Sequence, residues 1–301
     1  MTSLSARALA PLMPRPTPTD ALQLHSMQRD RLRSSATWLV AGVVGAHFAG
    51  LALPFGGTAG GWVAFSLVAA VALAMLAVGF AQLVLLARAE PQRAPQAAGI
   101  AAAAALGALL APVAGLLSIL LGLLHLAGPV AVLALGICLL AFDPSMRAGM
   151  PRPWLGALAG VAVGLGALAA GVVDGLVLLP LAMVPGMPLE QIYAGLAAAG
   201  EDWGVWVPVV WAGLWAVALV ALALGLLRNR RSQRGALGLL LGAAVVALLS
   251  LPVTQFSMGM SIGDTVVTQG SPVSAAYPVI LLGGALLAAL AAGLLIGARR
   301  R

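Results

Sequence analysis

Three polar side chains lie within long apolar stretches of the chain. His47 is ten residues into the first apolar run, Gln82 stands in the second, and Asp174 is the only carboxylate within any such run. A polar or ionisable group loses its hydration in apolar surroundings unless another group pairs with it. All three residues are therefore candidates for a functional role.

His47 has two possible roles. An imidazole in this position could bind a metal ion or haem, or relay a proton. Alternatively, a neutral imidazole could hydrogen-bond a neighbouring helix, which the small residues Gly45, Ala46, Ala49 and Gly50 would allow to approach closely. The surrounding small residues favour the second, structural role.

Asp174 lies near the far end of its run, in the string VVDGLVLLP. A helix that begins near Trp154 would carry Asp174 about 30 Å along its axis, close to the outer boundary of a bilayer. The residue could form part of an outer site, but a solvated helix end is the favoured interpretation. Pro180 and Pro185 prevent a regular helix beyond it, and a chain that bent back toward the bilayer would cover Asp174.

Methionines recur in the segments expected on the outer side. Thioether and imidazole groups are ligands that Cu(I) prefers, so these residues are weak candidates for a metal site. They are Met183, Met187, Met258, Met260 and His125. Their spacing is not diagnostic of copper binding, and we expect no cofactor.

The sequence gives an enzyme little support, and we assign no catalytic residue. Its 16 basic residues are all arginine, so a phosphate-loop lysine, a Schiff-base lysine and a lysine general base are excluded. The string SIGDTV around Asp264 is similar to the glycine-aspartate motif of intramembrane aspartyl proteases. However, Ser261 replaces the first glycine, and the string falls in an expected loop.

Composition and run length predict an all-α integral membrane protein. The chain is 61% hydrophobic and 8% charged, whereas soluble domains have about 25% charged residues. About 20 apolar residues span a bilayer. The run 97–142 would form a helix of about 69 Å, too long for one crossing, and must divide near residues 120–125. We therefore predict a polytopic bundle of about eight helices, at 37–54, 62–87, 97–119, 125–142, 154–178, 204–227, 235–255 and 277–298.

The positions of the arginines predict the orientation of this bundle. With eight crossings, all 16 arginines fall in the two termini and in alternate loops, which places them on one side. Positive residues are retained on the cytoplasmic side, so both termini are expected in the cytoplasm and the protein in the plasma (inner) membrane. This topology also explains the net charge of +7 without a nucleic-acid partner.

Four segments outside the predicted crossings have recognisable patterns. Residues 1–36 form a proline-rich, basic cytoplasmic tail, with a short interfacial helix expected from about Thr19 or Asp20, and 299–301 form a cytoplasmic arginine tail. In 186–203 we expect a short surface helix that starts after Pro188 and is ended by Gly200. Residues 256–276 are rich in Ser, Thr and Gly and are expected to be a loop with a short strand-like VVT.

The leading functional hypothesis is a small-solute transporter or a permease component, because almost the whole chain lies in the predicted bundle. The alternative is a non-enzymatic accessory or assembly subunit whose glycine ridges pack on other membrane subunits or on a second copy. Such ridges occur at Gly42, Ala46 and Gly50, and at Gly156, Gly160 and Gly164. A membrane-embedded enzyme or a copper-handling protein is the third possibility. The lipid bilayer is the expected partner in every case.

Overall fold

The computed structural model describes residues 18–53, 59–120, 153–229, 231–268 and 270–299, and no β-strand occurs in these ranges. The α-helices are α1 Pro18–Ala52, α2 Ala59–Ala89, α3 Ala94–Leu120, α5 Pro153–Val173, α6 Leu179–Met183, α7 Leu189–Ala199, α8 Trp203–Arg228, α9 Gln233–Leu249, α10 Pro252–Thr265 and α11 Tyr277–Arg299. A 3₁₀ turn, η2 (Pro91–Arg93), joins α2 to α3, and a π-helical turn, η4 (Asp174–Leu178), joins α5 to α6.

The chain is a multi-pass α-helical membrane protein. Within the described ranges, seven stretches are long and apolar enough to cross a bilayer: Asp30–Ala52, Gly61–Ala89, Pro91–Gly115, Trp154–Met183, Trp203–Arg228, Gln233–Thr265 and Tyr277–Ala298. The additional predicted crossing, 125–142, lies outside the described residues.

Close approaches at glycines fix the relative directions of the first three helices. A Cβ added to Gly42 would touch Leu76, and one added to Gly79 would touch Leu39, so α1 and α2 are antiparallel. A Cβ added to Gly107 of α3 would lie near Val43 of α1, and one added to Gly115 would lie near Leu51, further along α1. The two helices therefore run parallel.

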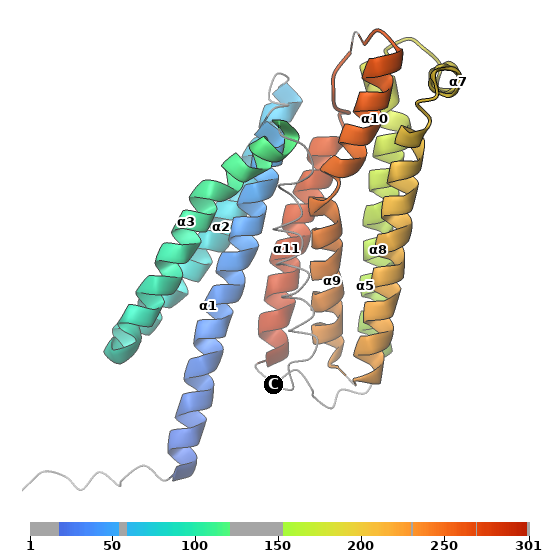
Figure 1. Ribbon diagram of the computed structural model, residues 1–301. Helices are drawn as coiled ribbons and strands as arrows, with labels where there is room; N and C mark the ends of the chain where they lie inside the picture. Colours follow the sequence, from blue (N-terminus) through green and yellow to red (C-terminus); the bar gives the residue numbers. More distant parts are fainter. Residues whose placement is uncertain (1–17, 54–58, 121–152, 230, 269, 300–301) are drawn as a thin grey trace, which may run out of the picture.

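The remaining helices also run in one of these two opposite directions. Gly156 lies against Gln233 and Gly171 against Leu251, so α5 runs parallel to α9. Figure 1 shows that α1, α3, α5 and α9 run one way along the bundle and α2, α8 and α11 run the other way. Helices α3 and α5 run in the same direction, as expected if the chain crosses the membrane once between them.

The two ends of the bundle differ in charge. Arg88 lies in the last turn of α2, Arg228 ends α8 and Arg234 lies in the first turn of α9, all at the end where α1 begins. We call this the arginine end. The opposite end carries α7 with Glu190 and, just beyond it, Glu201, and we call it the acidic end (Figure 1).

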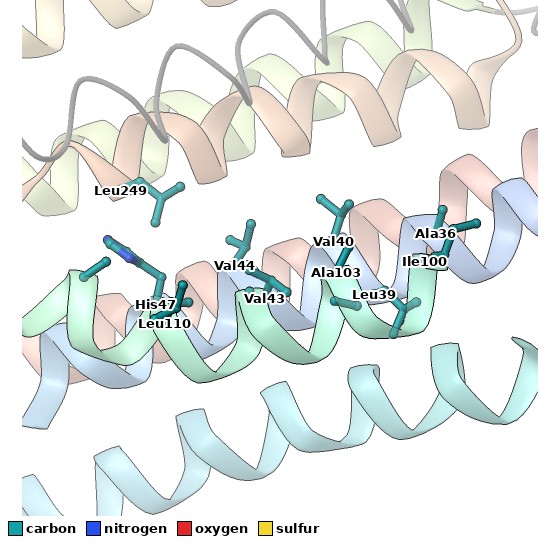
Figure 2. A pocket seen from close by; sticks show the side chains of 14 residues that line it. Ala36, Leu39, Val40, Val43, Val44, His47, Ile100, Ala103, Leu110 and Leu249 are labelled. Atoms are coloured by element: carbon teal, nitrogen blue, oxygen red, sulfur yellow. The ribbon is translucent and has the colours of Figure 1, made fainter. Parts of the chain in front are cut away.

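An apolar cavity of about 650 Å³ lies between α1 and α3, and Leu249 at the end of α9 closes one side of it (Figure 2). Apart from His47, all the described side chains that line the cavity are apolar. The lining residues are Ala36, Leu39, Val40, Val43, Val44, His47, Ile100, Ala103, Ala104, Gly107, Leu110, Ala111, Ala114 and Leu249.

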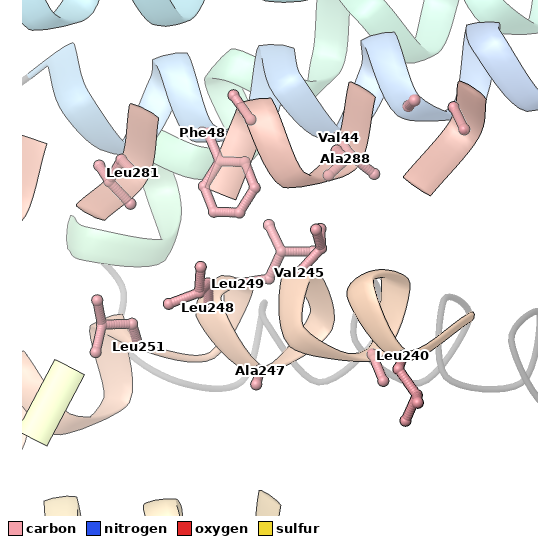
Figure 3. Packing of buried hydrophobic residues seen from close by; sticks show 14 of the residues in the cluster. Val44, Phe48, Leu240, Val245, Ala247, Leu248, Leu249, Leu251, Leu281 and Ala288 are labelled. Atoms are coloured by element: carbon pink, nitrogen blue, oxygen red, sulfur yellow. The ribbon is translucent and has the colours of Figure 1, made fainter. Parts of the chain in front are cut away.

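Helix α9 is the central helix of the bundle. Of its 17 residues, 13 are buried, in keeping with a sequence that is apolar on all sides. Figure 3 shows Val245 and Leu249 of α9 opposite Phe48 of α1 and the α11 residues Leu281 and Ala288. Because α9 contacts α5 and α8 as well, the main hydrophobic core is organised around it.

Two segments differ from their predicted structure. The predicted loop 256–276 is wrong in its first half, where α10 extends to Thr265 and includes Asp264, and no strand forms at VVT. Serine and threonine indicated a loop, but within α10 they donate to their own helix carbonyls: Ser257 to Thr254 and Thr265 to Ser261.

The second difference concerns the N-terminal segment, where a separate short helix was expected. The helix begins at Pro18 and continues without interruption into the first span. Ser35 and Thr37 donate to the carbonyls of Arg31 and Arg33, so these polar residues are accommodated inside one continuous helix.

The short helix on the acidic end is confirmed. α7 follows Pro188, which is extended, and ends at Gly200, whose φ of 75° is in the left-handed region that glycine adopts readily.

The glycine contacts between α5 and α9 lead to a prediction on stability. A Cβ at Gly156 would overlap the backbone carbonyl of Gln233, which cannot move without displacing α9, whereas Gly166 of the same helix has nothing near its Cβ position. We expect Gly156→Ala to lower the free energy of unfolding by about 1–3 kcal/mol. The matched Gly166→Ala should be neutral or stabilising by up to about 1 kcal/mol. Thermal unfolding in detergent measures both, and equal effects would contradict the packing.

Candidate functional site

Asp174 is completely buried, so its interpretation as a solvated helix end is wrong. The helix does not end at this residue but continues as the π turn η4 and then as α6 to Met183. Two later segments cover the carboxylate, namely the first turn of α10 and the residues that precede α11. The site therefore combines three parts of the chain at the acidic end.

Both carboxylate oxygens of Asp174 accept hydrogen bonds from neutral side chains. Gln255 of α10 donates from Nε2 to Oδ2 at 2.6 Å, and the hydroxyl of Ser274 donates to Oδ1. Ser274 is itself held in place, because its Oγ accepts the backbone N–H groups of Ala276 and Tyr277, each at 3.1 Å. Ser274 thus caps α11 and binds Asp174 at the same time.

No cation neutralises Asp174 in the described part of the chain. One ion pair joins Arg93 to Glu90, at 3.0 Å and at the other end of the bundle. Gln255 uses its amide nitrogen on Asp174, and its buried Oε1 has no partner among the described residues. The site therefore presents one carboxylate and one free carbonyl acceptor, with neutral donors only.

The π turn that carries Asp174 arises from a proline. Pro180 has no N–H to donate to the carbonyl of Leu176 four residues earlier, so that carbonyl loses its helical partner. The hydroxyl of Tyr193 on α7 donates to it instead. The chain also adds a residue to the turn, since the N–H of Leu179 donates to the carbonyl of Asp174 in the i to i+5 pattern.

A second helix break lies opposite Asp174. α9 ends at Leu249 and α10 begins at Pro252. At the break, the Oγ of Ser250 accepts hydrogen bonds from the indole N–H groups of Trp211 and Trp215 of α8, at 2.8 and 3.1 Å. Gln255, the partner of Asp174, stands in the first turn after this break.

His47 is buried between α1 and α3 and is not part of the Asp174 site. Its imidazole hydrogen-bonds the backbone of Ala111 on α3, which is the contact expected for a histidine that joins neighbouring helices. The same side chain lines the apolar cavity (Figure 2).

Gln82 occupies a third location. Its Oε1 accepts hydrogen bonds from the hydroxyls of Ser34 at 3.1 Å and Ser35 at 3.5 Å, and so ties α2 to α1. The three intramembrane candidates are thus separated. Gln82 and Asp174 each have two polar side-chain partners, and Asp174 is the ionisable one of the two.

The methionines predicted as weak metal ligands lie mainly in a second hydrophobic cluster at the acidic end. Met183 and Met258 are buried there beside Leu179, Ile192 and Leu196, and Met187 packs against them. Met260 is 43% exposed, and His125 lies outside the described residues. In the described ranges no group of three or more His, Cys, Asp or Glu side chains could hold a metal ion.

The residues that complete the site differ in how visible they are in the sequence. Gln255 is an amide within the predicted run 235–255 and has the same signal that identified Gln82. Ser274 and Tyr193 give no such signal, because each becomes a partner only when the chain folds back on the π turn.

The fold and this site define a multi-pass α-helical membrane protein with a buried, hydrogen-bonded carboxylate between two helix breaks. No protein-family model, curated protein or solved structure matches the chain.

The Tyr193 bond leads to a second prediction. Burial raises the pKa of the Tyr193 hydroxyl above its usual value, so it remains a hydrogen-bond donor at neutral pH. Tyr193→Phe leaves the Leu176 carbonyl without a donor and should lower the free energy of unfolding by about 1–3 kcal/mol. Thermal unfolding in detergent measures the effect, with Gln191→Ala on the exposed side of α7 as the control. Equal stability of Tyr193→Phe and the wild type would show that the bond contributes nothing.

Proposed function

We propose that the protein is a carrier for a small solute and that Asp174 couples solute movement to a proton. The observation that carries this proposal is a fully buried carboxylate whose partners are the neutral donors Gln255 and Ser274. Ionisable side chains inside membrane bundles are rare, and in carriers they serve as relays for protons and ions.

The charge balance at Asp174 favours a proton as the coupling ion. An ionised carboxylate without a nearby cation is costly in apolar surroundings. In the proposed cycle Asp174 avoids this cost by binding a proton, and the amide of Gln255 turns so that its Oε1 accepts from the protonated oxygen. The proton is released when the site opens to water. A fixed arginine partner would abolish this exchange, and the described arginine side chains pair elsewhere or lie toward the arginine end.

The two helix breaks supply the flexibility that a carrier needs. Carrier sites are commonly formed by discontinuous helices, whose unpaired backbone groups and mobile joints lie beside the solute. In this protein the π turn at Asp174 and the break at Ser250 are adjacent, because Gln255 bridges from one to the other. Opening at either joint would alter the surroundings of Asp174.

Backbone hydrogen bonds hold the segment that covers the site. Gly270 and Ser271 donate from their N–H groups to the carbonyls of Met183 and Ala182, at 3.0 and 2.9 Å. Gly270 lies so close to Ala182 that a side chain would not fit. This segment leads directly to Ser274, so its release would uncover Asp174 toward the acidic end.

The free acceptor beside Asp174 suggests the kind of solute. A molecule that reaches the site meets the carboxylate and the unpaired Oε1 of Gln255, both of which accept hydrogen bonds. The proposed solute is therefore small and carries N–H or O–H groups. In the proposed orientation, the arginine end faces the cytoplasm and the acidic end faces the outside of a plasma membrane.

The coupling role of Asp174 can be tested in proteoliposomes loaded with the pH indicator pyranine. Gradients of labelled amino acids, sugars and amines should reveal a solute whose uptake moves protons. Asp174→Asn keeps the size of the side chain but cannot exchange a proton, and it should abolish the proton signal. Asp264→Asn, an exposed carboxylate on α10, is the matched control and should retain full proton-coupled uptake.

Two results would overturn the proposal. One is proton-coupled uptake by Asp174→Asn at the wild-type rate. The other is the absence of solute flux from the wild type together with a membrane partner that co-purifies with it, which would favour an accessory subunit. Size-exclusion elution of each variant at the wild-type volume separates loss of coupling from loss of folding.

The orientation can be tested with two exposed glutamines, one at each end. Gln92 lies at the arginine end and Gln191 at the acidic end. In a Cys138→Ala background, which removes the sole cysteine, an impermeant maleimide added to intact cells should label Gln191→Cys and not Gln92→Cys. Permeabilised cells should give both labels, and the reverse pattern in intact cells would refute the orientation.

A further inference from the structure

The cavity between α1 and α3 contains one polar atom that is not satisfied. His47 is 6% exposed, and its Nε2 is buried without a hydrogen-bond partner among the described residues. Figure 2 shows the imidazole at one end of a row of lining residues that reaches Ala36. The described residues that line the cavity are otherwise apolar, so they supply no partner for this nitrogen.

The second ring nitrogen determines what this partner must be. Since Nε2 is unpaired, we assign the hydrogen bond between His47 and the Ala111 backbone to Nδ1. The carbonyl of Ala111 can only accept, so Nδ1 carries the hydrogen and the neutral ring leaves Nε2 as an acceptor. The missing partner is therefore a hydrogen-bond donor.

We propose that this cavity binds an elongated apolar molecule that ends in a hydroxyl group, with the hydroxyl donating to His47 Nε2. The cavity volume of about 650 Å³ suits a small lipid-like ligand. From the level of His47 to that of Ala36 it extends about 16 Å along α1, at the usual rise per residue. A single chain with its polar group at one end matches both the length and the single acceptor.

Other occupants fit the cavity less well. A buried water molecule needs two to four polar partners, and the described residues that line this cavity offer one. A metal ion needs several ligands, and in the described ranges no suitable group of side chains surrounds His47. A wholly apolar molecule would fill the volume but would leave Nε2 unpaired.

The ligand has a route from the bilayer. Val40 and Leu110, which line the cavity, are 53% and 52% exposed, so its wall reaches the outer surface of the bundle. The site shares no residue with the Asp174 cluster and stands independently of the proposed carrier function.

Photolabelling of the purified full chain in detergent provides the test. The probe is dodecan-1-ol with a diazirine at its far end, and mass spectrometry locates the labelled peptides. Label should concentrate on the cavity-lining parts of α1 and α3. Unlabelled dodecan-1-ol should compete about threefold to tenfold better than its methyl ether, which cannot donate a hydrogen bond to Nε2.

Four variants distinguish the contribution of the His47 hydrogen bond to binding from the contribution of the cavity volume. His47→Phe should abolish the preference for the alcohol over the ether, and His47→Gln, which restores an acceptor, should recover part of it. Ala103→Trp fills the cavity and should remove the competed label. Leu109→Trp, on the exposed side of α3 outside the cavity, should leave it unchanged.

The proposal fails if the alcohol and the ether compete equally in the wild type. It also fails if His47→Phe keeps the preference, or if the label spreads over all helices without competition. Thermal unfolding of each variant shows whether a lost label reflects a lost site or a lost fold.

Discussion

A bilayer provides no water, so every backbone N–H and C=O group within it needs a partner inside the protein. Regular helices meet this requirement by themselves, and most of the bundle consists of them. Exceptions lie where a helix is interrupted, and at two of them a side chain replaces the lost bond. Tyr193 donates to the carbonyl that Pro180 leaves free, and Ser274 accepts the first N–H groups of α11. Tyr193 and Ser274, two polar residues of the acidic end, thus provide hydrogen-bond partners for backbone groups at these interruptions.

These interruptions lie around the carboxylate of Asp174. The two halves of the bundle are therefore held together by different kinds of contact. Toward the arginine end the helices pack through glycines, with Gly156 against Gln233 and Gly238 against Leu295, and leave little freedom for movement. Toward the acidic end the contacts are a smaller hydrophobic cluster around Met183 and Met258 and hydrogen bonds between short segments. A structure that opens will open where fewer contacts must break, which is the end that holds Asp174.

The sequence predicted well those features that depend on local pattern. Run length located the described spans, and Pro188 with Gly200 located α7, because these signals act within a few residues. The surroundings of Asp174 could not be predicted in this way. Its two partners, Gln255 and Ser274, are 81 and 100 residues away in the chain, and one of them lay in a segment whose composition indicated a loop. Burial of a carboxylate by distant segments leaves no local signature.

The two proposed sites meet at one structural element. Leu249 lines the cavity beside His47, and it is also the last residue of α9, directly before the break at Ser250. Gln255, on the other side of the break, holds Asp174. A molecule in the cavity would therefore pack against one side of the joint while a solute at Asp174 acted on the other. A ligand shifts such a joint only by the difference in its affinity for the two arrangements. Any coupling between the sites would accordingly depend on how far Leu249 moves when α10 swings away from Asp174.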